Sequence, residues 1–166
     1  MNVNRVLDHI REQVDEENLT NSCSGEGCRV DMTGVPSDRV VIDVEREFDL
    51  CNRTEKRCDR LLFFIDTDEN YLVAAPIELK SGRAEQSDVV EQLQNSLHFA
   101  ANIVPRTRTL TTVYRPILFQ GRGIKWTNPR GPQELNVNFR GKLRIRQGRC
   151  GRSENLARVL SEPDIL

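Results

Sequence analysis

The stretch that decides the fold is residues 58–82, Cys-Asp-Arg-Leu-Leu-Phe-Phe-Ile-Asp-Thr-Asp-Glu-Asn-Tyr-Leu-Val-Ala-Ala-Pro-Ile-Glu-Leu-Lys-Ser-Gly. Residues 59–66 are rich in Leu, Phe and Ile and predict one strand, and residues 71–80 predict a second. The residues between them, Thr67-Asp68-Glu69-Asn70, are typical of a turn. We therefore predict an antiparallel hairpin.

The register of this hairpin decides which polar residues meet. If the turn is centred on residues 68–69, paired residues have numbers that sum to 137, and Asp59 lies opposite Glu78. Because side chains alternate along a strand, Lys80 shares the face of Glu78, and its apolar neighbours point to a core. Two carboxylates and one ammonium are then expected at one end of the hairpin. A slip of one residue would break this arrangement.

Length and composition indicate how many domains the chain has and what class of protein it is. We interpret the 166 residues, 1–166, as one domain with its own core, because 37% hydrophobic and 30% charged residues are typical of a globular protein. The apolar runs are too short to span a membrane, and the N-terminus has no apolar signal segment, so we predict a cytoplasmic protein without a membrane partner. The odd number of cysteines, five, argues against a secreted disulfide framework.

Charge is distributed unevenly along the chain. Residues 1–100 hold 11 Lys/Arg against 21 Asp/Glu, whereas residues 101–166 hold 13 against 4. One interpretation is a polyanionic partner that meets a carboxylate-rich centre. The other is that the two parts attract each other within the fold, and charge alone does not separate these two interpretations.

The remaining elements follow from periodicity. Apolar residues at helical spacing predict an amphipathic helix over 3–18 and a long helix over 84–104 that ends at Pro105. Strands are predicted over 29–32, 39–45 and 109–120, the last with an irregularity at Pro116. Residues 45–57 are interpreted as a charged connection. Residues 135–139 and 143–147 predict a second hairpin, and Ser153 begins a short last helix.

This order predicts an α/β fold, a mixed β-sheet flanked by helices, with an additional C-terminal basic hairpin and short helix.

At the end of the first hairpin, Asp59 and Glu78 are suitable ligands for a hard cation such as Mg²⁺ or Mn²⁺, and the carbonyl of Leu79 would add a third oxygen. Such an ion activates water, and Lys80 would assist the attacking water or neutralise phosphoryl charge. The alternative is a salt bridge at a strand end.

The spacing of Asp59 from Glu78-Leu79-Lys80, with 18 residues between the two acids, resembles the PD-(D/E)xK nuclease superfamily. The resemblance covers residues 1–120 in topology and the hairpin alone in motif. It implies a restriction-endonuclease-like core, metal binding by Asp59 and Glu78, and a catalytic Lys80. One departure is Cys58, where a proline often stands.

The same resemblance implies two further kinds of residue. A glutamine of the helix after the hairpin often joins the site in that superfamily, and Gln92 is the matching residue here. Some members add a glutamate from the first helix, for which Glu12 and Glu16 are the candidates. The ordinary interpretation of these two glutamates is a solvated helix face.

The cysteines allow a structural alternative. Four thiolates, those of Cys23, Cys28, Cys51 and Cys58, could hold a structural Zn²⁺, although their spacings differ from those of a zinc ribbon. The competing interpretation is that they are small apolar residues of the core.

The basic third of the chain is the predicted nucleic-acid surface. From residue 140 to residue 146 of the C-terminal hairpin, every second residue is basic, so these side chains are expected on one face. A tryptophan in the preceding loop would either stack on a base or close the edge of the core. The residues are Arg122, Lys125, Trp126, Arg130, Arg140, Lys142, Arg144 and Arg146.

Together these features predict a metal-dependent endonuclease. DNA is favoured over RNA as the substrate by the resemblance alone, and a homodimer or a protein partner would supply specificity. The alternative is an inactive module of the same fold that binds nucleic acid or a protein in a defence or repair system. A third hypothesis is a zinc-stabilised adaptor.

Overall fold

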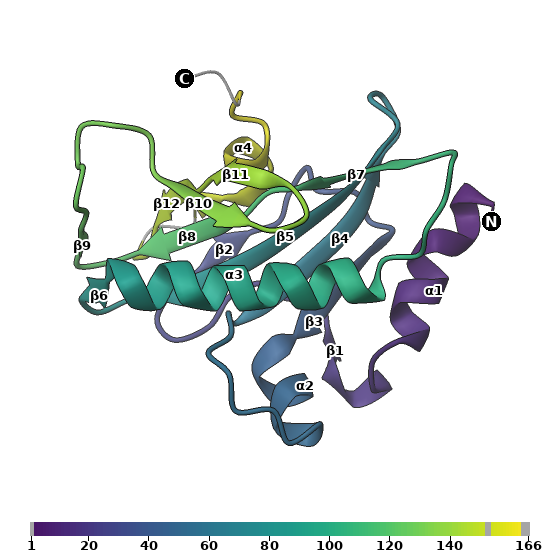
Figure 1. The fold of residues 1–166 in the computed structure, drawn as a ribbon, viewed down its shortest axis with the longest axis horizontal. Helices are drawn as coiled ribbons and strands as arrows, with labels where there is room; N and C mark the ends of the chain where they lie inside the picture. Colours follow the sequence, from purple (N-terminus) through teal and green to yellow (C-terminus); the bar gives the residue numbers. More distant parts are fainter. Residues whose placement is uncertain (1, 152–153, 164–166) are drawn as a thin grey trace.

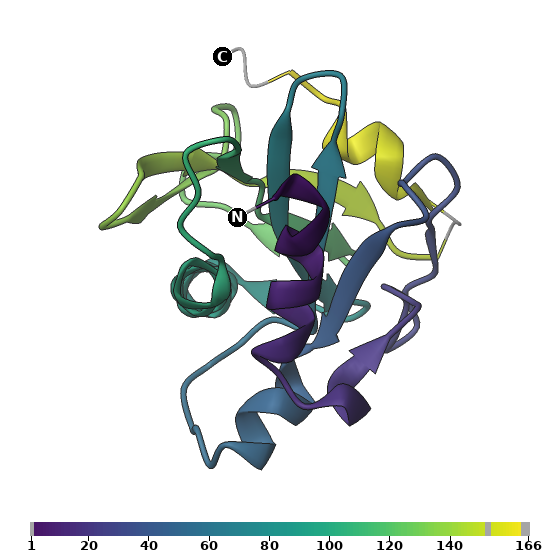
Figure 2. The same ribbon diagram turned by 90° about the vertical axis from the view of Figure 1, so that its right-hand side faces the viewer.

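The computed structural model describes residues 2–151 and 154–163. Its helices are α1 (Val6–Glu12), α2 (Val44–Leu50), α3 (Gln86–Ile103) and α4 (Leu156–Leu160), with 3-10 turns η1 (Val3–Arg5) and η2 (Glu16–Asn18). They flank a central mixed β-sheet, so the mixed α/β class is confirmed (Figure 1). Seen along the sheet, α3 covers one face and α4 the other (Figure 2).

Seven strands of the described residues form the central sheet in the order β1-β3-β4-β5-β8-β12, with β7 also paired to β5. Their bounds are β1 (Leu19–Thr20), β3 (Arg39–Asp43), β4 (Arg60–Asp66), β5 (Tyr71–Lys80), β7 (Thr111–Tyr114), β8 (Ile117–Gln120) and β12 (Arg146–Arg149). Strands β1, β3, β4 and β5 are antiparallel neighbours, whereas β7, β8 and β12 join by parallel pairing. The sheet is therefore antiparallel on one side of β5 and parallel on the other.

The predicted register of the first hairpin is confirmed. Strands β4 and β5 pair Arg60 with Ile77 at one end and Asp66 with Tyr71 at the other, so paired numbers sum to 137. At the turn, Asp66 accepts hydrogen bonds from the backbone N–H groups of Asp68 and Glu69, and Asn70 adopts φ 58°. This turn chemistry fixes the register that brings Asp59 beside Glu78.

The predicted irregularity at Pro116 is also present. Strands β7 and β8 pair with β5 in one continuous register but are separated at residues 115–116. In that register Pro116 stands level with Pro76 of β5. Neither proline has a backbone N–H to donate, so the ladder is interrupted at this point. Beyond the interruption, β8 runs beside the Glu78 end of β5.

Two clusters of buried apolar side chains lie on the two sides of the sheet. On the α3 side, Leu61, Phe63 and Ala74 of the sheet pack with Val89 and Leu93 of the helix. On the α4 side, alternate residues of the same strands join a second cluster. There Leu62, Ile77, Leu79 and Phe119 pack with Leu156. The alternation of apolar residues places Glu78 on the α3 side.

Two predicted segments have different bounds or structure from those expected. The helix predicted over residues 3–18 ends at Glu12, and the side chain of Asp15 begins the separate turn η2 by accepting from the N–H of Glu17. Residues 45–57 are not only a charged connection, because they include most of α2. Helix α2 is capped by Asp43 and buries Phe48, so it begins directly where β3 ends.

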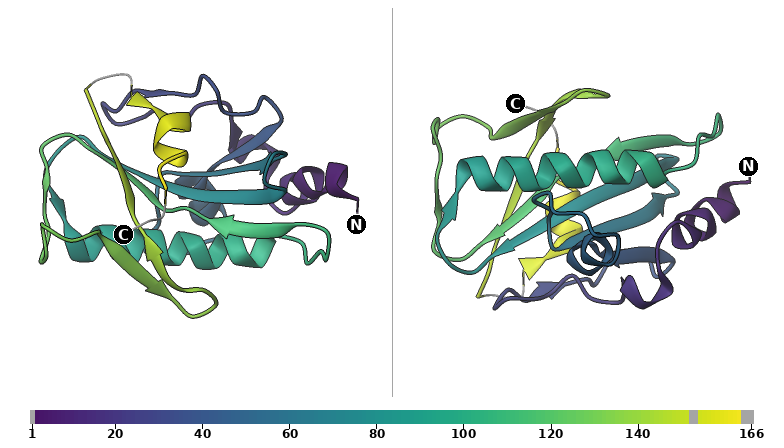
Figure 3. Two further views of the ribbon diagram at one scale, coloured as in Figure 1. Left: turned by 90° about the horizontal axis from the view of Figure 1, so that it is seen from above. Right: turned by 60° about the horizontal axis from the view of Figure 1, so that its bottom comes forward.

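The C-terminal part differs from the predicted hairpin. Strands β10 (Glu134–Val137) and β11 (Gly141–Arg144) form a separate ribbon on the α3 side (Figure 3), where Gln94 donates to the carbonyl of Asn136 at 2.8 Å. The chain then enters the central sheet as β12. Ser153 lies outside the described residues, and the cap of α4 is Asn155, whose side chain accepts from the N–H of Arg158.

Two short strand pairs complete the fold. Strand β2 (Val30–Asp31) pairs with β13 (Glu154–Asn155), and β6 (Ala84–Glu85) pairs with β9 (Ile124–Lys125). The second pair holds the loop after β8 against the beginning of α3. Among the described residues, no helix combines the length and apolarity needed to cross a membrane.

Candidate active site

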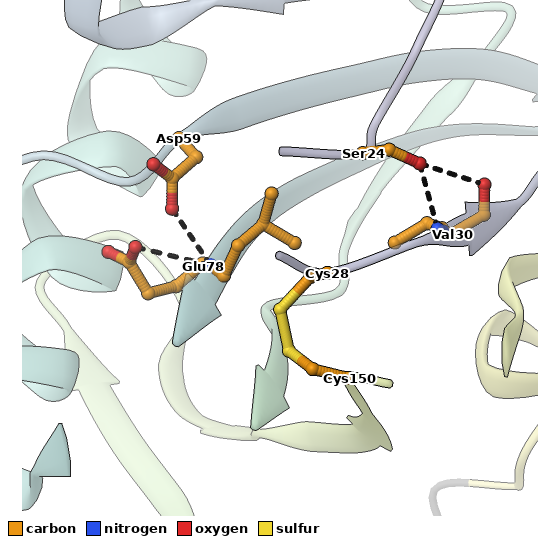
Figure 4. The surroundings of a disulfide bond; sticks show 7 residues. Ser24, Cys28, Val30, Asp59, Glu78 and Cys150 are labelled. Atoms are coloured by element: carbon orange, nitrogen blue, oxygen red, sulfur yellow. Dashed lines mark hydrogen bonds between the residues drawn. A yellow bond between two sulfur atoms is a disulfide. The ribbon is translucent and has the colours of Figure 1, made fainter. Parts of the chain in front are cut away.

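Two buried carboxylates meet at the end of the β4–β5 hairpin. The backbone N–H of Leu79 donates to Oδ2 of Asp59 at 2.8 Å and to Oε1 of Glu78 at 3.2 Å. Figure 4 shows both side chains reaching toward this one amide. Asp59 is 8% exposed and Glu78 is 2% exposed. The predicted pairing of these two acids is therefore present in the structure.

The environment of Glu78 opposes a second negative charge. Burial raises the pKa of Glu78 to about 10, and a hydrogen bond with the Asp59 carboxyl and the charge of Asp59 add to this rise. Lys80 and the Leu79 amide act in the opposite direction. Without a further cation, the pair therefore holds a proton at neutral pH, because two adjacent buried carboxylates cannot both ionise at low cost.

Lys80 and Gln92 lie in the same cleft. The cleft has a volume of ≈ 340 Å³, and Asp59, Glu78, Lys80 and Gln92 all line it. Within the described part of the chain, Oε2 of Glu78 and Oε1 of Gln92 are buried oxygens without a hydrogen-bond partner. Buried polar atoms are normally paired, so these two acceptors in one cleft are suited to a water, another hydrogen-bond donor or a cation.

Two carboxylates from outside the hairpin, those of Glu26 and Glu45, lie beside Asp59. Ligand oxygens of Glu26, Glu45 and Asp59 lie within 4.8 Å of one another. Partial burial raises the pKa of Glu45, and the charge of Asp59 is the next largest cause. Together with Glu78, these residues surround the Asp59 carboxylate with acidic side chains on both sides.

Glu26 and Glu45 were missed by sequence reasoning, and the candidates Glu12 and Glu16 were wrong. Neither Glu12 nor Glu16 lines the cleft, because α1 lies beside β3 and η2 packs against α2, where Asn18 donates to Glu47. Glu45 is the second residue of α2, whose capping residue Asp43 ends a strand. An Asp followed by alternating acidic residues at the end of a strand was the available signal for this helix.

Glu26 is presented by a tight turn. Residues 25 and 28 exchange backbone hydrogen bonds of 3.0 Å and 2.7 Å, and both central residues, Glu26 and Gly27, have positive φ. These φ values are those of a type I′ turn, which favours glycine. The turn packs over the end of β5, where a Cβ on Gly27 would lie 3.3 Å from Ser81.

Cys58 anchors the Asp59 end of β4 to α3. The backbone N–H of Cys58 donates to the buried hydroxyl of Ser96 at 2.8 Å, and the Cys58 thiol donates to the carbonyl of Arg60 at 3.1 Å. Burial raises the pKa of the Cys58 thiol, and the charge of Glu78 adds to the rise. Cys58 is therefore a neutral core residue that positions its neighbour Asp59.

The four-cysteine zinc group is not formed. Cys28 is joined to Cys150 by a disulfide (Figure 4), and Cys51 is an exposed residue after α2. Cys23 is buried, and burial raises the pKa of its thiol to about 12. Because Cys28 and Cys150 are 122 residues apart, the sequence offered no local sign of their pairing.

The predicted basic surface is divided between the loop after β8 and the β10–β11 ribbon. Arg122, Lys125 and Arg130 are exposed on the loop after β8. Arg140 and Lys142 are exposed on the β10–β11 ribbon, where Arg140 donates to the carbonyl of Thr112. Half-buried Arg144 donates to the carbonyl of Pro163 and lies 3.8 Å from Glu162. Trp126 is half-buried and packs against the α3-side core.

Arg146 does not belong to this surface. It is 1% exposed and donates to the carbonyl of Leu160, because it lies in β12 and points to the α4 side. The chain leaves the ribbon at Ile145, so the alternation that links Lys142 to Arg144 does not continue to Arg146. The prediction of four basic residues on one face was therefore wrong for Arg146.

No model of a known protein family, no curated protein and no solved structure matches this chain. The resemblance to the PD-(D/E)xK superfamily thus stays a prediction drawn from the hairpin residues. Functional inference for this chain therefore rests on the geometry of the cleft.

Proposed function

We propose that this protein is a metal-dependent nuclease that hydrolyses phosphodiester bonds, with Asp59 and Glu78 as metal ligands and Lys80 as the catalytic ammonium. The proposal is supported above all by one observation. Two buried carboxylates share the Leu79 amide in a cleft that also holds Lys80 and two unpaired buried oxygens.

The donor set of the cleft fits Mg²⁺ or Mn²⁺. The available ligand atoms are carboxylate and amide oxygens, which hard divalent cations prefer. A cation beside Oε2 of Glu78 would pair with this oxygen, which has no hydrogen-bond partner. It would also favour the ionised form of the Glu78 carboxyl, whose pKa is raised in the metal-free protein. Asp59, Glu78 and Gln92 would hold the ion on one side, and Glu45 and Glu26 adjoin Asp59 on the other. The Leu79 carbonyl remains a proposed further ligand.

The chemistry divides between the ion and the side chains. A bound divalent cation would lower the pKa of water and stabilise charge on a phosphate. Lys80 lies on the Glu78 face of β5 and would neutralise the charge that develops on the phosphoryl oxygens. The Leu79 amide holds both carboxylates in place, which reduces the reorganisation needed when substrate binds. DNA is preferred over RNA as the proposed substrate by the family resemblance alone.

The test is cleavage of plasmid, single-stranded DNA and RNA in Mn²⁺ or Mg²⁺. We expect wild-type protein to cut, and we expect Glu78→Ala and Lys80→Ala each to reduce the rate at least ~100-fold, the usual effect of removing one electrostatic catalytic group. Glu12→Ala is the matched control, because Glu12 is exposed on α1 and does not line the cleft. A wild-type protein that binds nucleic acid but cuts none of these substrates would instead support the inactive binding module.

A further inference from the structure

A basic hollow lies next to the cleft, at the ends of β8 and β12. Its volume is ≈ 400 Å³, and it is lined by Gln120, Arg122, Ile124, Trp126 and Arg149 together with two glycines. No acidic side chain of the described residues is among these. Arg149 and Gln120 have no part in the proposed cleavage site, so the hollow is a separate feature of the surface.

Strand pairing connects the hollow to the catalytic end of β5. In the parallel ladder Lys80 pairs with Gln120, and Gln120 pairs with Arg149. Residues paired in this way lie on the same face of a sheet, and neighbouring strands are about 4.8 Å apart. Arg149 therefore lies about 10 Å from Lys80 across two strand steps. A chain of phosphates that entered the cleft at Lys80 would pass this row.

The wall between the cleft and the hollow is held in place. The side-chain amide of Gln120 donates to Oε1 of Gln147 at 2.7 Å. Gly121 passes so close to β5 that a Cβ would lie 2.4 Å from the carbonyl oxygen of Ser81. On the other side, the N–H of Thr127 donates to Gln86 at the start of α3, at 2.6 Å. The loop that presents Arg122 is thus fixed at both ends.

Within residues 2–151 and 154–163, no carboxylate neutralises the two arginines of the hollow. Arg122 and Arg149 are exposed, and no carboxylate of the described residues forms an ion pair with either. Ion pairs do engage other arginines, namely Arg11, Arg53, Arg57, Arg60, Arg144 and Arg158. Two uncompensated guanidinium groups in one hollow are suited to a phosphate, which they bind through paired N–H donors.

We propose that Arg122 and Arg149 form a subsite for a phosphate of the substrate strand that neighbours the scissile phosphate. The inference rests on the proposed nuclease function and deepens it, because the substrate is then a polynucleotide strand with several phosphates rather than a small phosphodiester. Lys80 and the two carboxylates act on one phosphate, and the hollow holds another phosphate of the same strand. Trp126 serves as part of the hollow's wall, since its ring packs against the core.

The test compares a one-phosphate substrate with a polynucleotide. The variant is Arg122→Ala/Arg149→Ala, and the control is Arg106→Ala/Arg108→Ala, which removes two exposed arginines from the loop that leads to the opposite end of the sheet. Cleavage of bis(p-nitrophenyl) phosphate and of a single-stranded oligonucleotide is measured with Mn²⁺. We expect the ratio of kcat/KM values, oligonucleotide over small diester, to fall at least tenfold in the variant only.

Binding provides a readout that does not need catalysis. Oligonucleotide affinity is measured in Ca²⁺ by fluorescence anisotropy across a range of salt concentrations. Loss of two phosphate contacts should reduce the slope of log affinity against log salt by about 1.4 for a single strand. An unchanged ratio and slope in the variant, or an equal loss in the control, would overturn the subsite.

The two proposals fail in different ways. Absence of cleavage with binding that depends on Arg122 and Arg149 would remove the nuclease activity and retain these arginines only as a phosphate-binding site of a non-catalytic protein. Cleavage of both substrates without dependence on these arginines would retain the nuclease and remove the subsite. Wild-type protein that neither cuts nor binds would overturn both.

Discussion

Glu78 is the residue on which the site depends most, and its burial has a cost. The carboxyl is 2% exposed, one of its oxygens is unpaired, and its pKa is raised to about 10 by burial and by Asp59. Buried ionisable groups that lower the stability of the folded protein often belong to functional sites, because selection for stability alone would replace them. The same properties make its contribution measurable.

The raised pKa of Glu78 predicts a stability that falls with pH. In the unfolded chain this carboxyl loses its proton near pH ~4.3, whereas in the folded protein it keeps the proton to about pH 10. Its contribution is therefore fully present below pH ~4.3 and is lost progressively above it, by about 1.4 kcal/mol per pH unit. In urea unfolding, we expect the free energy of unfolding of metal-free Glu78→Gln to rise relative to that of wild type by about 1.4 kcal/mol per pH unit between pH ~5 and pH ~8. Equal pH dependence of the two proteins would contradict the assignment.

Substitution of Glu45 tests whether the carboxylates outside the hairpin contribute to metal binding. Its oxygens lie within 4.8 Å of ligand atoms of Glu26 and Asp59, so its charge supports a cation at Asp59. We expect Glu45→Gln to weaken Mn²⁺ binding about tenfold, a typical effect of a group next to metal ligands. Calorimetric titration measures this change, and Glu12→Gln on α1 is the control. Affinity unchanged by Glu45→Gln would exclude this residue from the site.

At the scale of elements, the hairpin alone does not position the carboxylates. Helix α3 holds Cys58 through Ser96 and supplies Gln92, and α2 supplies Glu45. The connection between α2 and β4 is attached to α3 as well, because Asn95 donates to the carbonyl of Lys56 at 2.8 Å. The cleft is therefore formed by a strand pair and two helices that are joined by specific hydrogen bonds.

Ser96 is predicted to stabilise the site through a single hydrogen bond. Ser96→Ala leaves the buried N–H of Cys58 without its acceptor, which costs about 1–3 kcal/mol. Chemical denaturation measures this loss, and Ser87→Ala on the exposed side of α3 is the matched control. Since Asp59 follows Cys58, Mn²⁺ affinity should also fall in Ser96→Ala. A variant as stable as the control would show that the bond contributes nothing.

At the scale of the whole molecule, one disulfide links distant parts of the chain. Cys28 belongs to the turn that presents Glu26, and Cys150 follows β12, so the bond ties this turn to the edge of the sheet. The α4-side core lies around the same bond, as both cysteines contact that apolar cluster. The disulfide therefore acts on global stability and on the placement of Glu26 together.

Removing this bond should destabilise the protein strongly. Because the two cysteines are separated by 122 positions in the sequence, the chain-entropy model predicts a loss of about 5 kcal/mol on reduction. Urea unfolding with and without dithiothreitol measures it, and Cys28→Ser/Cys150→Ser, which cannot respond to reductant, is the control. Titration of thiols in the unfolded, unreduced chain should find the three free cysteines, Cys23, Cys51 and Cys58. Five reactive thiols would contradict the bond.

The sequence predicted what is local and missed what joins distant residues. The turn at residues 67–70 and the alternation of β5 were sufficient to predict that Asp59 meets Glu78, because hairpin register is a short-range property. Helix α2 was missed because two turns of helix hold too few apolar residues for a periodic pattern. The disulfide and the approach of Glu26 depend on contacts between distant segments, which no local pattern specifies.

Arg146 was misplaced because of a similar non-local effect. Alternation placed it with Lys142 and Arg144, but alternation holds only within one strand, and the chain changes sheets at Ile145. Whether a strand continues or ends between two residues depends on its neighbours in the fold.

Asp59 and Glu78 are proposed above all to hold a divalent cation in this cleft. The most direct measurement is anomalous diffraction from a crystal soaked in Mn²⁺ at pH ~8, where the ion competes best with the proton shared by the pair. We predict a Mn²⁺ peak in contact with Asp59 and Glu78, beside Gln92, that is absent from Glu78→Gln crystals. A soaked wild-type crystal with no peak at these carboxylates would contradict the proposed site.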